Sequence, residues 1–136
     1  MVLSTEVIAN CTISAANLSV SGYDTIVAHK AADFDNQSNL TVACTKDTGA
    51  EVTFDEGGNT GRKLKDPSGD FLDSELYTDK AGGAVWGSAE LSGKTIVVTG
   101  LAQPQTVYAR INGGQNVSAG SYTDTDTDTV TAIINF

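Results

Sequence analysis

The most constraining feature of this sequence is an alternation of apolar residues that continues to its last residue. Four residues of the final segment share one parity: Val130, Ala132, Ile134 and Phe136. Alternate residues of a strand face the same side, so this parity predicts one buried face. The first ten residues are also extended in pattern, with Leu3 and Val7 on one parity. A domain with a strand at each terminus has edges that can receive or donate a strand.

Short alternating segments of this kind recur along the whole chain. The candidate strands are Leu3–Ala9, Cys11–Ser14, Thr25–His29, Ser38–Cys44, Glu51–Phe54, Lys63–Leu64, Leu72–Thr78, Lys94–Leu101, Thr106–Ile111 and Thr129–Phe136. Gly-rich and Pro-containing turns separate them, such as Gly57-Gly58-Asn59 and Pro67-Ser68-Gly69. No segment shows a sustained helical period. At 136 residues, the chain is predicted to form one all-β sandwich domain.

Charge and hydropathy exclude several classes of partner. The formal net charge of −9 argues against nucleic-acid binding, which needs clustered Lys and Arg to neutralise phosphates. No apolar run approaches the length that spans a bilayer, so we expect no direct membrane insertion. The segment after Met1 lacks the basic and apolar regions of a signal peptide. If the protein is exported, we expect this sequence to be its mature or expressed form.

Few residues could build a catalytic or metal centre, and we predict neither an enzyme nor a cofactor. The one histidine, His29, has no Gly-x-Ser-x-Gly motif to accompany it as part of a hydrolytic triad. The repeat Thr123–Thr129 carries Asp124, Asp126 and Asp128. In a strand these carboxylates would lie about 6–7 Å apart, which is too wide for one Ca²⁺ without further ligands. We therefore predict no metal site.

The aromatic residues leave two alternatives. Trp86, Tyr77 and Tyr108 could form a platform for sugar rings, but such residues more often fill the core of a sandwich. Core packing is the favoured interpretation.

The two cysteines, Cys11 and Cys44, each end a short alternating segment. Two cysteines without a nearby histidine cannot form a structural zinc site. The residues alone leave open a pair of buried free thiols or a disulfide.

An ordered series of motifs narrows these possibilities. In chain order they are Asn10-Cys11-Thr12-Ile13-Ser14, Gly22-Tyr23-Asp24, Val42-Ala43-Cys44-Thr45, Arg62-x-Leu64, Leu76-Tyr77-x-Asp79, Trp86-Gly87, Val107-Tyr108-Ala109-Arg110-Ile111 and Ala119-Gly120-Ser121-Tyr122-x-Asp124. The series covers nearly the whole chain. It resembles the spore coat protein U domain, which is shared with the major subunits of archaic chaperone–usher pili.

The resemblance implies an incomplete immunoglobulin-like β-sandwich that lacks its last strand and is completed by donor-strand exchange. Residues 1–10 would be the donor segment and residues 11–136 the pilin domain. The donor side chains would be Leu3, Thr5, Val7 and Ala9. They would enter a groove beside the last strand, at Val130, Ala132, Ile134 and Phe136. The resemblance also implies a Cys11–Cys44 disulfide that ties the first strand to the second.

The implied function is that of a structural subunit, a pilin, of a bacterial surface fibre that serves adhesion and biofilm formation. Its partners would be identical neighbouring subunits, together with a periplasmic chaperone and an outer-membrane usher during assembly. The chain would be exported to the periplasm and end in an extracellular fimbrium. The alternative is a stand-alone secreted or spore-coat surface protein, or a carbohydrate-binding module, of the same fold. The two differ in whether residues 1–10 lie within their own domain.

Overall fold

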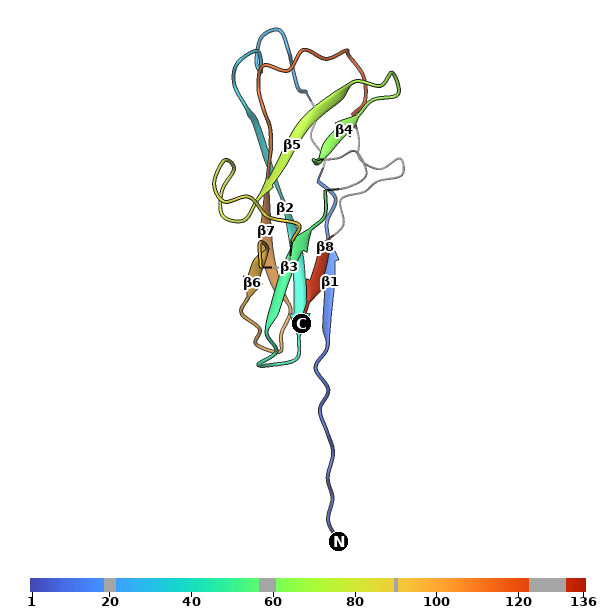
Figure 1. The fold of residues 1–136 in the computed structure, drawn as a ribbon. Coiled ribbons are helices and arrows are strands. Elements are labelled where there is room, and N and C mark those ends of the chain that lie inside the picture. Colours follow the sequence, from blue (N-terminus) through green and yellow to red (C-terminus); the bar gives the residue numbers. More distant parts are fainter. Residues whose placement is uncertain (19–21, 57–60, 90, 123–131) are drawn as a thin grey trace.

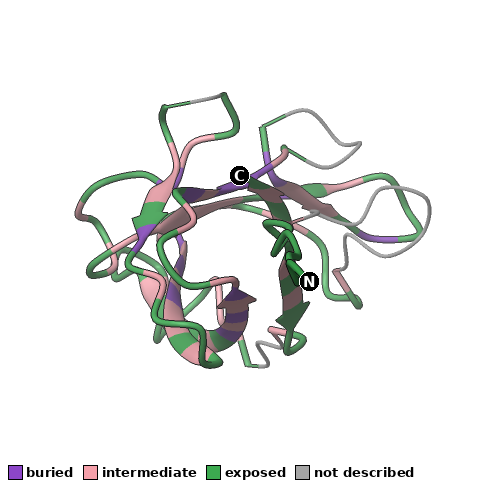
Figure 2. Ribbon diagram, turned by 90° about the horizontal axis from the view of Figure 1, so that it is seen from below, coloured by how far each residue is buried: buried purple, intermediate pink, exposed green. Residues whose placement is uncertain are grey.

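A computed structural model of the chain describes residues 1–18, 22–56, 61–89, 91–122 and 132–136. The described residues form two antiparallel sheets and no helix, which confirms the predicted all-β sandwich (Figure 1). The larger sheet has the order β1 (Cys11–Ala15), β2 (Phe34–Cys44), β7 (Gln103–Ile111), β5 (Phe71–Tyr77) and β4 (Lys63–Lys65). The smaller sheet has the order β6 (Lys94–Ile96), β3 (Ala50–Phe54) and β8 (Ala132–Asn135). Figure 2 shows the sheets curving around a common interior.

Most of the predicted strands are present, and three predictions need correction. The segment predicted at Leu3–Ala9 forms no strand in the isolated chain, where the first strand begins at Cys11. Residues 25–29 form turns because the Asp24 carboxylate accepts hydrogen bonds from the backbone N–H groups of Ile26 and Val27. His29 closes this loop, since its Nδ1 accepts from the Asp24 N–H at 2.9 Å. Such local side-chain bonds compete with strand formation. Of the segment predicted at Lys94–Leu101, only Lys94–Ile96 is a strand.

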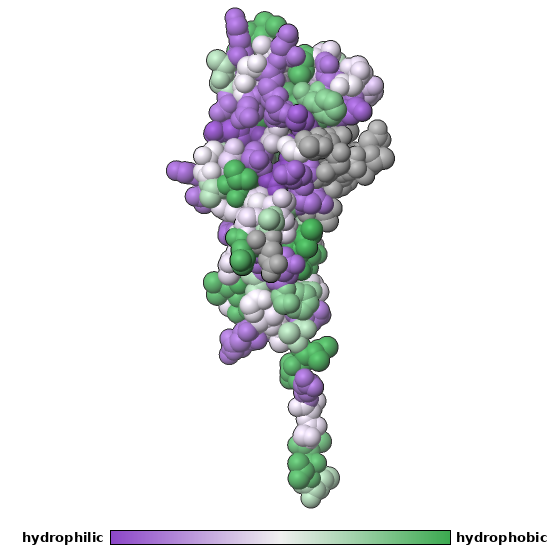
Figure 3. Space-filling model, viewed as in Figure 1, coloured by the Kyte–Doolittle hydropathy of each residue, from purple (hydrophilic) through white to green (hydrophobic). Residues whose placement is uncertain are grey.

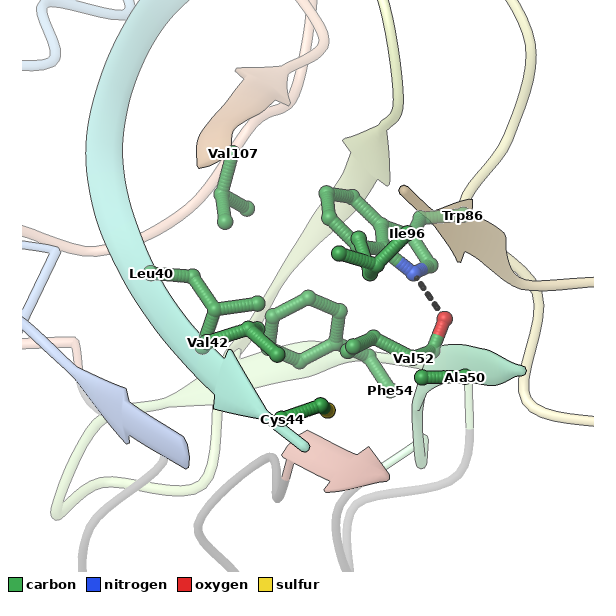
Figure 4. Close-up of a cluster of buried hydrophobic side chains, with 9 residues drawn as sticks. All are labelled: Leu40, Val42, Cys44, Ala50, Val52, Phe54, Trp86, Ile96 and Val107. Carbon is green, nitrogen blue, oxygen red and sulfur yellow. Dashed lines mark hydrogen bonds between the residues drawn. The ribbon is translucent and has the colours of Figure 1, made fainter. Parts of the chain in front are cut away.

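The core lies between the sheets, where alternate residues of facing strands meet (Figure 4). Its buried members are Leu40, Val42, Cys44, Ala50, Val52, Phe54, Trp86, Ile96 and Val107. Trp86 is fully buried, and its ring packs edge-on against Phe54 with 4.9 Å between the ring centroids. Its indole N–H donates to the Val52 carbonyl at 2.7 Å. This bond satisfies the indole's one polar group, as burial of a tryptophan requires. The interpretation of Trp86 as a core residue is confirmed.

A buried arginine joins the two sheets. Arg62 is only 5% exposed, and its guanidinium forms an ion pair with Glu75 of β5. The same guanidinium donates to the carbonyls of Phe54, at the end of β3, and Asp55, at 2.6 and 3.1 Å. Ser74 in turn donates its hydroxyl to the Arg62 carbonyl. A buried charge is tolerated only when it is paired and hydrogen-bonded in this way.

A second charged group lies on the outer face of the larger sheet. Arg110 of β7 donates two hydrogen bonds to Asp35 of β2, at 2.7 and 3.0 Å. These bonds to Arg110 hold the pKa of the Asp35 carboxyl below its ordinary value. A carboxyl whose pKa is lower in the folded state stabilises that state above its unfolded pKa and loses the contribution as the pH falls.

We therefore expect the free energy of unfolding to decrease as the pH falls below about 4, and Asp35→Asn to flatten this decrease. Because the pair is partly exposed, the effect is modest. Urea denaturation of both proteins between pH 5 and pH 2.5 measures it. Parallel acid profiles for the two proteins would contradict the assignment.

Candidate functional site

The first ten residues, here called the tail, lie outside their own domain (Figure 1). All ten are exposed and none forms a strand with the rest of the chain. Leu3 is 92% exposed and Val7 is 79% exposed. Figure 3 shows apolar residues along this projecting segment, whereas much of the upper body in that view is hydrophilic. At about 3.3 Å per residue, an extended tail of this length reaches about 33 Å.

The root of the tail is fastened to β2. Cys11 and Cys44 are paired across β1 and β2 and form a disulfide, with 4.0 Å between their Cα atoms. The structure thus contains the disulfide that the resemblance implies. Just beyond it, the Thr45 N–H donates to the Asn10 carbonyl at 2.8 Å. The Asn10 N–H donates to the Thr45 hydroxyl oxygen at 3.0 Å, and the Thr45 hydroxyl lies 3.3 Å from the Ile8 carbonyl.

Two sheet edges meet without being joined by hydrogen bonds. Among the described residues, β1 pairs with β2 alone and β8 with β3 alone. Yet β1 and β8 lie side by side and point in opposite directions (Figure 1). The open line between them is here called the seam. It leaves one row of backbone N–H and C=O groups unpaired on each edge, and such rows are templates for another strand.

The side chains of β8 alternate along the seam. Ala132 and Ile134 are half-buried and pack against the core, as their shared parity predicts. Ile133 faces the other way and is 42% exposed. Phe136, which follows the strand, is 59% exposed although it shares the inward parity. Val130 and the repeat with Asp124, Asp126 and Asp128 lie outside the described residues.

The domain also contains a cavity of about 630 Å³. Its lining includes residues 22–25, which come after β1 in the chain, and residues 117–122, which precede β8. Leu64, Leu72 and Ile111 of the larger sheet also line it. Leu72 and Ile111 are buried, so the cavity has an apolar component that the sheet supplies. The remaining lining comes from loop residues on either side of this apolar floor.

The polar lining of this cavity includes two tyrosines and one acidic residue, Tyr23, Tyr122 and Asp24. The Tyr122 hydroxyl donates to the Ser118 carbonyl at 2.8 Å. Burial, together with the nearby charges of Asp66 and Asp70, raises the pKa of Tyr122. The side chain and backbone N–H of Ser118 lower the pKa of Asp70. The bond from the Ser118 N–H to Asp70 holds the 117–122 segment in place. The raised pKa keeps the Tyr122 side chain neutral at physiological pH.

The described residues do not assemble a metal centre at this site. They contain no group of three or more His, Cys, Asp or Glu side chains that could hold a metal ion. His29 stacks on Tyr23 with 5.0 Å between the ring centroids and holds the 24–29 loop through its bond with Asp24. In the described part of the chain, no helix is long and apolar enough to cross a membrane.

The structure separates the three aromatic residues of the possible sugar platform. Tyr77 and Tyr108 are paired on neighbouring strands β5 and β7, while Trp86 is in the core. The sequence had not indicated the cavity, because its lining comes from five separate parts of the chain. The Gly22-Tyr23-Asp24 and Ala119–Tyr122 motifs were a usable signal, since both contribute to its lining.

Comparisons with known proteins identify the family of this chain. Residues 1–131 match the family model for the spore coat protein U domain. Protein U of Myxococcus xanthus is 32% identical over 121 residues, which is 80% of this chain and 68% of that protein.

A solved structure shares the fold. It is a chain in the crystal structure of the CsuC–CsuE chaperone–tip adhesion subunit pre-assembly complex, from archaic chaperone–usher Csu pili of Acinetobacter baumannii. The TM-score is 0.66 at 22% identity, and the match covers 96% of this chain but only 40% of that one. On the family match, this chain belongs to the spore coat protein U domain family.

Proposed function

We propose that this chain is a pilin-like structural subunit that polymerises by strand exchange into a bacterial surface fibre. The tail of one copy fills the seam of the next copy. The observation that carries the proposal is the coexistence of an exposed, alternating tail and two unpaired sheet edges in one chain. The tail has no strand to pair with in its own domain, and the two edges have unpaired backbone groups. An extended peptide adds to such edges through backbone hydrogen bonds.

The tail cannot fill the seam of its own domain. It continues directly from β1, and the Cys11–Cys44 disulfide and the Asn10–Thr45 bonds hold its root at the end of that strand. Residues 1–10 would have to reverse direction immediately before Cys11 to run beside β1. The donor segment must therefore come from another molecule.

The inserted strand pairs with edges that run in opposite directions, so it is parallel to one and antiparallel to the other. A strand between two others separates them by about 9–10 Å. The Cα atoms of β1 and β8 approach within 8 Å in the isolated chain. Insertion therefore has to widen the seam where the two strands are in contact. Leu3, Thr5, Val7 and Ala9 form the inward parity, since the opposite parity includes the charged Glu6.

The family and the fold extend this proposal to assembly and location. A chain of similar fold was crystallised as part of a chaperone–subunit complex of a pilus. By analogy, a periplasmic chaperone holds the seam open before a neighbouring tail enters it, and an outer-membrane usher exports the growing fibre. The finished fibre is extracellular and serves adhesion and biofilm formation. The role is structural and involves no enzymatic step.

Photo-crosslinking within filaments tests the proposal without requiring the register. A photoreactive residue at Leu3 should link to β1, β8 or the cavity lining of a second chain, as read by mass spectrometry. The same residue at Val2, on the opposite parity, is the matched control and should link mainly to solvent-exposed positions. Crosslinks from position 3 to the outer face of the larger sheet, or purified protein without filaments in electron micrographs, would refute strand exchange.

A further inference from the structure

If the proposed function holds, β1 has two roles in every subunit. Its first residue is the root of the tail that enters one neighbour. Its free edge is one wall of the seam that holds the tail of the other neighbour. A pull along the fibre would therefore act on β1 from its end while its side is needed to keep the seam formed.

By itself, β1 is poorly suited to carry such a pull. It has five residues, lies at the edge of its sheet and alternates between half-buried and exposed positions. Only Cys11 and Ile13 of this strand pack against the core. Its neighbour β2 is 11 residues long, lies between β1 and β7, and includes the buried residues Leu40, Val42 and Cys44.

The contacts at the root of the tail connect β1 and β2 at the end of β1 to which the tail would transmit force. The disulfide joins Cys11, the first residue of β1, to Cys44, the last residue of β2. Thr45 adds two hydrogen bonds to Asn10 and lies within hydrogen-bond distance of the Ile8 carbonyl. The covalent bond is thus at the loaded end of the β1–β2 pair rather than in its middle.

We infer that the Cys11–Cys44 disulfide, supported by Thr45, transmits the tension between neighbouring subunits of the fibre. Tension from the tail passes through the disulfide into β2, which is paired on both sides, and bypasses the hydrogen bonds between β1 and β2. The strand β1 then stays in register and continues to form its wall of the seam. Thr45 is a positioning residue in this joint, because it fixes the direction in which the tail leaves the domain.

Stretching single filaments before and after reduction tests the joint. Filaments are assembled from oxidised protein and then treated with a phosphine reductant, and alkylation of both thiols, read by intact mass, shows that the bond is open. Reduced filaments should remain intact at rest but rupture at clearly lower force. Thr45→Val, which removes the hydroxyl at similar volume, should also lower the rupture force. Thr48→Val, in the same turn, is its matched control and should leave it unchanged.

The possible outcomes separate this inference from the proposed function. Filaments that keep their rupture force after complete reduction would overturn the inference that the disulfide carries tension, while leaving strand exchange intact. Filaments that fall apart at rest on reduction would also overturn it, since the bond would then maintain the fold rather than carry tension. Failure of the untreated wild-type protein to form filaments would instead contradict the proposed function.

Discussion

Replacing Leu3 and Val7 together by Asp should abolish filament formation while leaving the domain folded. Both side chains are almost fully exposed in the isolated chain, so folding of the domain does not depend on them. Burial in a neighbour's seam would contribute about 1.5–3 kcal/mol for each, and a buried unpaired carboxylate would add a further cost. Electron microscopy and light scattering measure the loss of filaments, and circular dichroism checks the fold.

The opposite parity of the tail provides a matched control. Val2→Asp with Ile8→Asp introduces the same two charges and removes two apolar side chains of the same kind. Because these positions face away from the seam in the proposed arrangement, this variant should still form filaments. Equal loss in both double variants would show that the assigned parity is wrong. Normal filaments from the Leu3/Val7 variant would exclude strand exchange through the tail.

Arg62→Ala should strongly reduce the stability of the domain. Removing one partner of a buried ion pair typically costs about 3–5 kcal/mol, and the change also leaves the Phe54 and Asp55 carbonyls without their donor. The free energy of unfolding of a domain of this size is about 5–15 kcal/mol, so the expected loss is a large fraction of it. Urea denaturation measures it, with the Leu3/Val7 aspartate variant as the background that prevents polymerisation.

Two further substitutions test whether the loss of stability comes from the buried hydrogen bonds of Arg62. Arg62→Lys keeps the charge but cannot reach Glu75 and two carbonyls with one ammonium group, so most of the loss should remain. Lys63→Ala removes the neighbouring, largely exposed ion pair with Asp73, in which the charged atoms are 3.7 Å apart. Surface pairs contribute at most about 1 kcal/mol. A small effect of Arg62→Ala, comparable with that of Lys63→Ala, would contradict a joint between the sheets at Arg62.

Strand positions were predicted best where the apolar alternation of the sequence matches the buried face of a sheet. In β2 and β7 the alternation of apolar residues coincides with the inward face of a sheet, and both strands were predicted within a few residues. Residues 25–29 also include apolar and β-branched residues, but the Asp24 side chain offers the backbone nearer hydrogen-bond partners. A strand prediction fails where a local side chain satisfies the backbone more directly than a distant strand.

The candidate site was predictable in part. The extended tail follows from the sequence pattern, and two positions of the predicted last strand, Ala132 and Ile134, do lie against the core. The cavity depends on segments that are about 100 residues apart along the chain, residues 22–25 and 117–122. The bonds from Arg62 to β3 and β5 also depend on tertiary contacts. No local pattern encodes which distant segments meet, so these features required the structure.

The tail and the seam are different surfaces of one chain, and this asymmetry determines what kind of assembly can form. Contacts between unlike surfaces are heterologous and produce open chains unless the rotation closes a ring. A filament of such subunits is polar: one terminal subunit keeps an unused tail, and the other keeps an unfilled seam. The two ends are chemically distinct, so they can be capped and can grow by different routes. A shortened subunit without a tail could occupy only one of the two ends, and it would thereby set the direction in which the filament grows.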